Sequence, residues 1–329
     1  MHVLVTGAHG FIGSHLCREF LARGWQVRAL VSPWGQLDRL QALLQHPQLQ
    51  IVRADIRDAN SLRGCCQGVS HVVHAAAKVA DWGDAEAFEA VNVGGTKNLL
   101  RQAEAAGVVR MVLLSSIAVH AYRGFRHADT RRLPRDGYLN AYARSKIAAE
   151  DCLLAADLEP VIVRPGLWPF GEGDPNLARI IAALQSGWLP LLNGGRTVLN
   201  SAYVGNLCLG VALCVTEARA AGQSYLIADD GMPSWRELLT QLSQYLDCPP
   251  PRLSLPSAGL WPLATLSETL WQRYSEREPP LTRYRLSVMH RDVHFSQQAA
   301  REELGYRPRY SWQQGLERSC LAWQQQPWR

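Results

Sequence analysis

A glycine-rich segment that directly follows the first apolar run constrains the fold of this chain more than any other feature. Residues 2–6 (HVLVT) form a short apolar stretch, which is typical of a buried parallel strand. Gly7, Gly10 and Gly13 follow at a spacing of three, and residues 13–23 then place apolar side chains on one helical face. A strand, a glycine turn and a helix in this order predict the opening of a βαβ unit.

The alternation of apolar strands and helices continues through the first half of the chain. Residues 36–45, 85–107 and 139–156 are expected to be helical. The pattern predicts an α/β fold of the Rossmann type, with a doubly wound parallel sheet, over residues 1–165. The six expected strands lie at residues 2–6, 25–31, 49–53, 70–77, 109–116 and 160–165.

The second half of the chain has a looser pattern. Helices are expected at 174–187, 204–217 and 233–246, and loops rich in glycine and proline interrupt them. We therefore predict a smaller, C-terminal substrate-binding region over 166–329. It should be partly interleaved with the first domain, since such folds often send the chain back to the main sheet.

The glycine segment predicts binding of a dinucleotide, and a purely structural turn is the alternative. Gly7 allows a tight turn, Gly10 lets the backbone approach a pyrophosphate, and Gly13 lets the helix pack closely on the strand. The N-terminus of the helix offers unpaired N–H groups and the positive end of its dipole to phosphates. The residues expected to contact the cofactor here are Gly7, His9, Gly10, Phe11, Ile12 and Gly13.

Two further strand ends should face the same crevice. Asp55 and Ile56 follow the third strand, where a carboxylate can accept a hydrogen bond from an adenine amino group. An aspartate in this position is also a common helix cap. The small side chains of Ala75, Ala76 and Ala77 follow the fourth strand and leave room for a cofactor.

The end of the second strand bears on which dinucleotide is bound. NAD-binding proteins usually carry an acid there, which holds the ribose 2′-hydroxyl. Residues 30–33 (LVSP) contain no acid, so a 2′-phosphate has space. Ser32 could donate to that phosphate, and Arg39 or, with less support, Arg28 could pair with it. We therefore favour NADP(H) and keep NAD(H) as the alternative.

Tyr142 and Lys146 lie four residues apart in an expected helix, which places them on one face. A nearby ammonium stabilises a phenolate and lowers its pKa, so such a pair can move a proton to or from a substrate oxygen. Ten tyrosines and three lysines in 329 residues would give only about 0.09 such pairs by chance. A tyrosine stacked on an exposed lysine is the alternative.

Leu114, Ser115 and Ser116 end the fifth strand. Hydroxyl groups at the carboxyl end of a parallel strand point toward the ligand crevice. We expect Ser116 to orient the reacting carbonyl or alkoxide against Tyr142, and Leu114 and Ser115 to border the cofactor. Either serine could instead cap the strand.

These motifs together resemble the extended short-chain dehydrogenase/reductase superfamily. The resemblance rests on the TGxxGFIG loop, the Asp55–Ile56 pair, HAA at 74–76, Asn92, the two serines, YxxxK and RPG at 164–166. Four stretches are most similar to the 3β-hydroxysteroid dehydrogenase branch and its bacterial 2-alkyl-3-ketoalkanoate reductase relatives. They are residues 74–84, 164–181, 278–286 and 303–323.

The resemblance implies a reaction and a set of site residues. It implies reversible oxidation of a secondary alcohol to a ketone, with catalysis by Ser116, Tyr142 and Lys146. It further implies that Arg164, Pro165, Gly166 and Leu167 border the nicotinamide, and that the long helices pair in a homodimer. Two features depart from the family pattern: relatives often carry a larger polar residue at the position of Gly166, and residues 201–206 lack the acid often found after Tyr-Val.

Two other functions stay open. A nucleotide-sugar epimerase or dehydratase could use the same fold, but dehydratases of the superfamily need an acid just after the strand-five serine, where this chain has Ile117. A non-catalytic redox sensor could bind the cofactor, but such proteins typically lose the Tyr–Lys pair.

Tryptophans suggest the kind of substrate. Eight of the eleven lie after residue 165, and Trp82 follows the fourth strand. We expect a hydrophobic small molecule, with Trp82 and Trp168 near it, although core packing explains most single tryptophans. Lys78 either touches the substrate or is solvated, and His74 should be a hydrogen-bonded core residue.

Composition excludes several classes of protein. The eight cysteines form no CxxC pair and no Cys/His metal spacing, so we expect reduced thiols, no metal and a cytoplasmic protein. The net charge of +5 is scattered, which does not favour nucleic acid. The N-terminus has no basic region typical of a signal peptide. Residues 258–266 could form a lid or a shallow membrane contact but are too short to span, so membrane binding is not expected.

Overall fold

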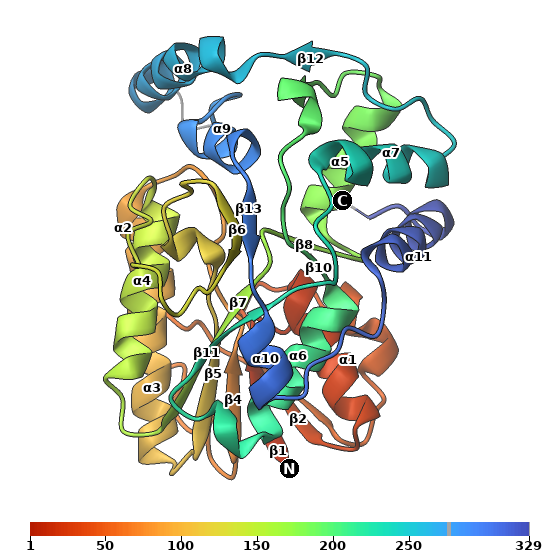
Figure 1. The fold of residues 1–329 in the computed structure, drawn as a ribbon. Helices are drawn as coiled ribbons and strands as arrows, with labels where there is room; N and C mark the ends of the chain where they lie inside the picture. The colour runs from red at the N-terminus through yellow and green to blue at the C-terminus, as the bar shows by residue number, and fades with distance from the viewer. Residues whose placement is uncertain (275–277, 329) are drawn as a thin grey trace.

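A computed structural model gives the structure of the chain and describes residues 1–274 and 278–328. Seven parallel strands form a central sheet in the order β11-β7-β5-β4-β1-β2-β3 (Figure 1). The strand order reverses between β1 and β4, which is where open α/β sheets bind ligands. The strands are β1 His2–Thr6, β2 Gln26–Val31, β3 Leu49–Arg53, β4 His71–His74, β5 Arg110–Leu114, β7 Glu159–Pro165 and β11 Ser224–Ile227.

Helices cover both faces of this sheet. Helices α1 (Phe11–Ala22) and α6 (Val204–Thr216) pack together over one face, whereas α3 (Gly95–Ala105) and α4 (Ala141–Leu154) cover the other (Figure 1). One buried apolar cluster lies on each face. The predicted doubly wound sheet is confirmed, with all six expected strands.

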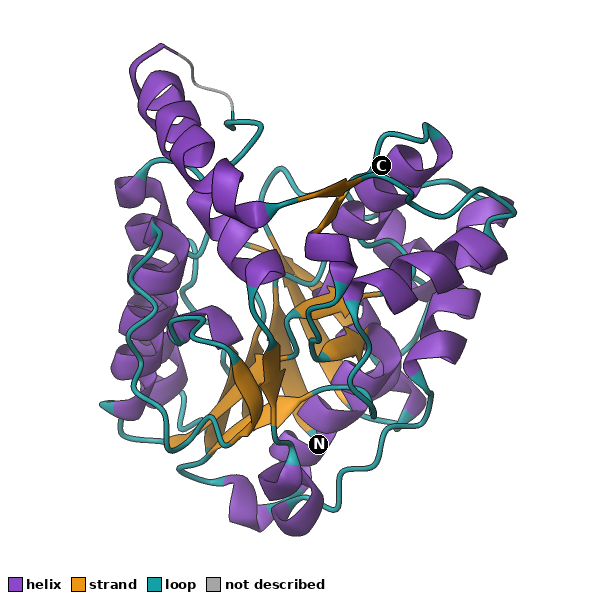
Figure 2. Cartoon of the chain, turned by 45° about the horizontal axis from the view of Figure 1, so that its top comes forward, coloured by secondary structure: helices purple, strands orange, loops and turns teal. Residues whose placement is uncertain are grey.

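The C-terminal half contributes to both parts of the molecule. Strand β11 extends the sheet beyond β7 and was not among the expected strands. Strand β11 and helix α6 both come from the second half of the chain but belong to the sheet layer of the first, so the two expected regions interleave. The other elements lie mainly above the carboxyl ends of the sheet (Figures 1 and 2). They are α5 Pro175–Gln185, α7 Trp235–Tyr245, α8 Leu260–Tyr274, α9 Arg283–His290, α10 Gln298–Glu303, α11 Trp312–Gln325, β6 Phe125–Ala128, β8 Trp168–Phe170, β9 Leu191–Leu192, β10 Ser201–Tyr203, β12 Ser254–Leu255 and β13 Val293–Phe295.

Two expected helices differ from the structure. Residues 36–45 form only a 3-10 helix over Asp38–Leu43. The helix expected over 85–107 is divided into α2 (Ala85–Phe88), a π-helical segment (Glu89–Gly94) and α3. A π-helical turn widens the helix locally and often occurs at functional sites. Here it carries Asn92, whose buried side chain holds a neighbouring loop.

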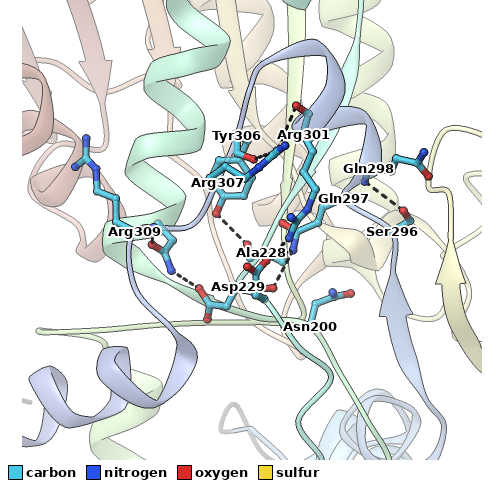
Figure 3. Close-up of polar contacts among 12 residues, drawn as sticks. Asn200, Ala228, Asp229, Ser296, Gln297, Gln298, Arg301, Tyr306, Arg307 and Arg309 are labelled. Carbon is cyan, nitrogen blue, oxygen red and sulfur yellow. Dashed lines mark hydrogen bonds and ion pairs between the residues drawn. The ribbon is translucent and has the colours of Figure 1, made fainter.

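The missing acid after Tyr203-Val204 has a structural counterpart at the end of β11. The buried Asp229 carboxylate accepts hydrogen bonds from Ser201 Oγ at 2.8 Å and from Asn206 Nδ2 at 2.7 Å. An acid at position 206 would therefore face another acid. Figure 3 shows this junction, where Tyr306 also donates to the carbonyl of Ala228.

Residues 258–266, expected to form a lid or a membrane contact, run into α8, which is partly exposed at the top of the molecule (Figure 2). Within the described residues, none of the helices is both long and apolar enough to cross a bilayer.

Candidate active site

A cavity of about 380 Å³ lies at the carboxyl ends of β1 to β4 and brings together nine of the residues expected to bind a cofactor. Because these strands are parallel, the loops that follow them meet at this one edge. The lining residues are Gly7, His9, Gly10, Leu30, Ser32, Trp34, Ala54, Asp55, Ile56, Arg57, Ala75, Ala76, Ala77, Lys78 and Val91.

The glycine segment has the close packing that its spacing predicts. Gly7 has a φ of +65°, and a Cβ there would lie 2.8 Å from Ala76 Cα. A Cβ on Gly13 would lie 2.2 Å from the carbonyl oxygen of Gly7. Helix α1 then begins with the N–H groups of its first turn at the cavity, while Phe11 and Ile12 pack against the core. This cradle fits the diphosphate of a dinucleotide.

The end of β2 is surrounded by basic side chains. Arg53 donates from Nη1 to the carbonyls of Ser32 and Gly35 at 3.2 and 3.1 Å, so it fixes the turn that follows β2. His9 Nε2 lies 3.5 Å from Ser32 Oγ, and His9 Nδ1 is buried without a hydrogen-bond partner among the described residues. Burial, followed by the charges of Arg39 and Arg53, lowers the pKa of His9.

Of the two arginines expected near a 2′-phosphate, Arg39 donates from Nη2 to the carbonyl of Gly173 at 3.0 Å. Arg28 donates to the carbonyls of Cys65 and Gln67, so its guanidinium is bound elsewhere. Arg53 was missed because it ends β3, and only the pairing of β2 with β3 brings it beside Ser32.

The Asp55 carboxylate is already engaged at this end of the cavity. Arg57 donates from Nε to Oδ1 at 3.1 Å and from Nη2 to Oδ2 at 2.8 Å, and this contact lowers the pKa of Asp55. The Arg57 guanidinium also lies over the ring of Trp34, at 5.5 Å from its centre. Asp55 can therefore accept a bond from an adenine amino group only by sharing its oxygens with Arg57.

Helix α4 positions the Tyr142–Lys146 pair. It begins after Asn140, whose side chain accepts a hydrogen bond from Ala143 N at 2.9 Å. Tyr142 and Lys146 lie one turn apart on it. Lys146 is buried and donates from Nζ to the carbonyl of Leu114 at 2.6 Å, which ties it to the end of β5. Burial lowers the pKa of Lys146 to about 8, and the Glu150 charge opposes this shift.

The phenol of Tyr142 stays protonated at neutral pH in this arrangement. Burial raises its pKa, and the nearby Ser116 hydroxyl partly offsets the rise. Burial, and not the Lys146 charge, has the largest effect on the pKa of Tyr142, because the lysine Nζ is directed to the carbonyl of Leu114. Ser116 also accepts a hydrogen bond from Ala118 N at 3.1 Å, which fixes its position.

The side chains of Ser115 and Arg164 point away from the crevice. Ser115 donates to Glu150, and Arg164 makes two bonds to the same carboxylate at 2.9 and 2.7 Å. All three side chains are buried, so they join β5, α4 and β7 behind the site. Any contact that Ser115 or Arg164 makes with a cofactor must come from the backbone.

The segment after Arg164 is equally confined. Pro165 ends β7, and a Cβ on Gly166 would lie 2.9 Å from the carbonyl oxygen of Asn200. A larger residue, as in relatives, therefore does not fit here. Leu167 packs against neighbouring apolar clusters.

A second cavity, of about 610 Å³, lies where α2 and α4 begin and where α8 and α9 approach them. Trp82 lines it, as expected of a substrate residue, but charged side chains are more numerous than tryptophans. The lining residues are Asp81, Trp82, Gly83, Asp84, Ala85, Phe88, Leu139, Asn140, Ala141, Arg144, Glu268, Gln272, Arg283 and Tyr284. Phe88 lies between this cavity and the catalytic group, with its ring centre 6.3 Å from that of Tyr142.

The other two substrate predictions have different outcomes. Lys78 lines the cofactor cavity, and its Nζ lies 5.4 Å from the centre of the Phe88 ring. Trp168 belongs to the core, where it is 5% exposed and packs against Phe170 and Trp235. It lines neither of the two cavities, and a count of aromatic residues does not separate ligand contacts from core packing.

Asn92 was given no role from the sequence, yet it holds the site together. Its side chain accepts from Lys78 N at 2.8 Å and donates to Ser145 Oγ at 2.8 Å. It therefore links the loop after β4 to α4 between Tyr142 and Lys146. Its position in an apolar helical stretch was the signal that could have revealed it.

Comparison with known proteins places this geometry in a family. The sequence profile of the NAD dependent epimerase/dehydratase family matches residues 3–228, which include the glycine segment, Ser116 and the Tyr142–Lys146 pair. The chain belongs to this family. The predicted membership of the extended short-chain dehydrogenase/reductase superfamily is thereby confirmed.

Relatives within the family include reductases and dehydrogenases. The chain is 31% identical to a 2-alkyl-3-oxoalkanoate reductase of Stenotrophomonas maltophilia, over 97% of this chain and 98% of the relative. It is also 31% identical to a 3 beta-hydroxysteroid dehydrogenase/Delta 5→4-isomerase of Mycobacterium tuberculosis, over 98% and 90%. Both support the prediction that the chain is an enzyme of the dehydrogenase/reductase kind.

A solved structure extends the similarity to the whole fold. A double mutant of DesIV, a dTDP-glucose 4,6-dehydratase from Streptomyces venezuelae with NAD bound, superposes with a TM-score of 0.78. It is 26% identical and is matched over 99% of this chain and 98% of its own.

Proposed function

We propose that the protein is an NAD(P)(H)-dependent oxidoreductase that interconverts a secondary alcohol and a ketone. The observation that supports this most is a protonated phenol, Tyr142, beside the Ser116 hydroxyl and one turn from the Lys146 ammonium. All three groups lie at the edge of the sheet where the dinucleotide cradle opens. A nicotinamide cofactor bound there supplies or accepts the hydride.

Ser116, Tyr142 and Lys146 have different roles in the proton transfer. In the direction of reduction, Ser116 holds the carbonyl oxygen by a hydrogen bond, and Tyr142 gives its proton to that oxygen as negative charge develops on it. The Lys146 ammonium stabilises the resulting phenolate until a proton returns from solvent. In the direction of oxidation the same groups act in reverse, with Tyr142 as the base.

The substrate that we propose is a ketone or alcohol on a largely hydrophobic small molecule. The support comes from the two relatives, whose names give a 2-alkyl-3-oxoalkanoate and a 3β-hydroxysteroid as substrates. Trp82 and Phe88 give the second cavity apolar walls beside its charged ones.

Replacing Tyr142 by Phe tests this function. The variant keeps the ring and its contact with Phe88 but loses the acid, so kcat should fall by about 10²- to 10⁴-fold while NAD(P)H still binds. Turnover of ketones by nicotinamide absorbance, and binding by fluorescence, measure the two effects. Tyr138→Phe is the matched control, since Tyr138 is 58% exposed on the preceding loop and its loss should change kcat less than twofold. A Tyr142→Phe variant with near-normal kcat would contradict the assignment.

We further propose that NADP(H) is the preferred cofactor. The end of β2 carries no carboxylate, and Ser32, His9 and Arg53 surround the position that a 2′-phosphate would take. The unpartnered His9 Nδ1 and the nearby Arg39 add further donors and positive charge.

Replacing Ser32 by Asp should reverse this preference. A carboxylate there would repel a 2′-phosphate and could accept from a 2′-hydroxyl, so the Kd ratio of NADPH to NADH should rise at least tenfold. Position 32 suits this test better than position 31, because Val31 is fully buried in the core. Ser32→Ala controls for loss of the hydroxyl alone. An unchanged ratio in Ser32→Asp would place the 2′-phosphate elsewhere.

A further inference from the structure

Two tyrosines that the proposed mechanism does not use lie beside the catalytic group. Tyr122 follows the 3-10 turn after β5, and Tyr284 lies in the first turn of α9. Their hydroxyl oxygens are 3.3 Å apart and their ring centres 6.1 Å apart. Tyr284 also lines the second cavity. Two elements more than 160 residues apart in sequence thus bring two phenols together next to the site.

The start of α9 is fixed to the loop after β4. The helix cap Thr282 donates to Asp81 at 3.0 Å and accepts from Arg285 N at 3.0 Å. Arg285 in turn pairs with Asp81 at 2.6 Å. Residues on both sides of Tyr284 are therefore anchored to one carboxylate, and the phenol is held in place before a ligand binds.

Both phenols are neutral at physiological pH. Tyr284 lines the same cavity as Ala141 and Phe88, which adjoin Tyr142: Ala141 precedes it in α4, and the Phe88 ring centre is 6.3 Å from that of Tyr142. Burial raises the pKa of Tyr122 and of Tyr284, and a negative charge on Tyr142 would raise both further. Two neutral hydroxyls that share one hydrogen bond still hold one O–H hydrogen to donate. Because Tyr284 faces the cavity, that hydrogen can be offered to a ligand there.

Most charged groups around the cavity already have a polar partner. Arg285 neutralises Asp81, and Arg283 donates to Glu268 from its backbone N and Nε at 2.7 and 2.6 Å. Asp84 accepts from two backbone N–H groups of α2. Tyr284 is therefore a neutral donor in a cavity whose acids and bases largely satisfy one another.

We propose that Tyr284, held by Tyr122, is a specificity-determining residue that donates a hydrogen bond to a second oxygen of the substrate. This inference rests on the proposed function. The substrate class is a ketone with an acceptor oxygen two or three bonds from the reacting carbonyl, such as a β-keto ester or β-keto acid. An isolated ketone would leave the Tyr284 hydroxyl without a partner inside the site, and sites built around a hydrogen bond discriminate strongly against such analogues.

Two ketones of equal chain length provide the test. Ethyl 3-oxooctanoate has the second carbonyl, and 6-undecanone has the same number of chain atoms and the same ketone position but no ester group. We expect Tyr284→Phe to lower kcat/KM for the keto ester by about 10- to 100-fold and to change that for 6-undecanone less than threefold. The ratio of kcat/KM for the keto ester to kcat/KM for 6-undecanone is compared between variants, because this comparison cancels the different intrinsic reactivity of the two ketones.

Further variants separate a specific contact from a structural one. Tyr122→Phe removes the holding bond but leaves Tyr284 in place, so it should lower the same ratio by a smaller factor. Tyr245→Phe, on α7 far from the cavity, should leave it unchanged. Circular dichroism and NADPH binding establish that each variant is folded. If Tyr284→Phe did not fold, the change of the kcat/KM ratio in Tyr122→Phe alone would decide whether the proposed contact exists.

The outcomes are distinguishable. Equal losses on both ketones in Tyr284→Phe would show a structural role and overturn the inference, as would no loss on either. Wild-type protein that reduces both ketones with a ratio insensitive to Tyr284 and Tyr122 would keep the proposed function and overturn only the inference. Wild-type protein that reduces neither ketone with either cofactor would contradict both.

Discussion

At the scale of single residues, His74 shows how a polar group is kept inside the sheet. Its Nδ1 lies 2.7 Å from Thr6 Oγ1 and its Nε2 lies 3.1 Å from Thr96 Oγ1, so both ring nitrogens are satisfied in the neutral form. Burial, and secondarily the Lys146 charge, lowers its pKa to about 3. The sequence-based assignment of His74 as a core residue agrees with this geometry.

The lowered pKa predicts acid sensitivity. Below pH 6.5 the unfolded chain binds a proton at His74 that the folded protein does not, so stability is lost as the pH falls toward 3. At pH 5 this loss amounts to about 2 kcal/mol for a pKa near 3 in the folded protein and 6.5 in the unfolded one. Urea unfolding at pH 7.5 and pH 5 should therefore show a fall about 2 kcal/mol larger in wild type than in His74→Gln. Equal falls would mean that His74 titrates normally in the folded protein.

At the scale of elements, local features were predictable and long-range ones were not. The glycine segment could be assigned because its requirements lie within seven consecutive residues, from Gly7 to Gly13. The π-helical segment could not, because its Asn92 is bonded to Lys78 and Ser145, which are 14 and 53 residues away. The helical pattern over 85–107 is the same with or without that widened turn.

The candidate site also contains local features, which were predictable from the sequence, and long-range contacts, which were not. The spacing of Tyr142 and Lys146 follows from one helix and was predictable. The bond from Lys146 to the carbonyl of Leu114 depends on how α4 packs against β5. Arg53 and Tyr284 were missed for the same reason, since only strand pairing and the anchoring of α9 bring them to the site.

At the scale of the whole molecule, the C-terminal half is joined to the sheet by buried polar contacts. Asp229, at the end of β11, accepts from Tyr203 N and Asn206, and the Asn206 side chain accepts from the backbone of Tyr310 before α11. Helix α6 begins directly after Tyr203 and packs against strands of the sheet, so it connects this junction to the sheet. We therefore expect residues 1–165 and 166–329 to unfold together, although the sequence pattern changes at residue 165.

Replacing Asp229 by Ala tests that coupling. The change leaves the donors on Ser201, Tyr203 and Asn206 without their acceptor in a buried site, so the free energy of unfolding should fall by about 2 to 4 kcal/mol. Asp230→Ala is the matched control, because Asp230 is exposed and pairs with Arg301 at the surface, where such a pair contributes about 1 kcal/mol or less.

Two probes distinguish coupled from separate unfolding. Tryptophan fluorescence reports mainly on the C-terminal half, which holds eight of the eleven tryptophans, and far-ultraviolet circular dichroism reports on all helices and strands. If the junction couples the halves, both probes should shift by the same amount in Asp229→Ala and remain coincident. A fluorescence transition that moves to lower urea while the dichroism transition divides in two would show that the halves are independent and that Asp229 stabilises only its own side.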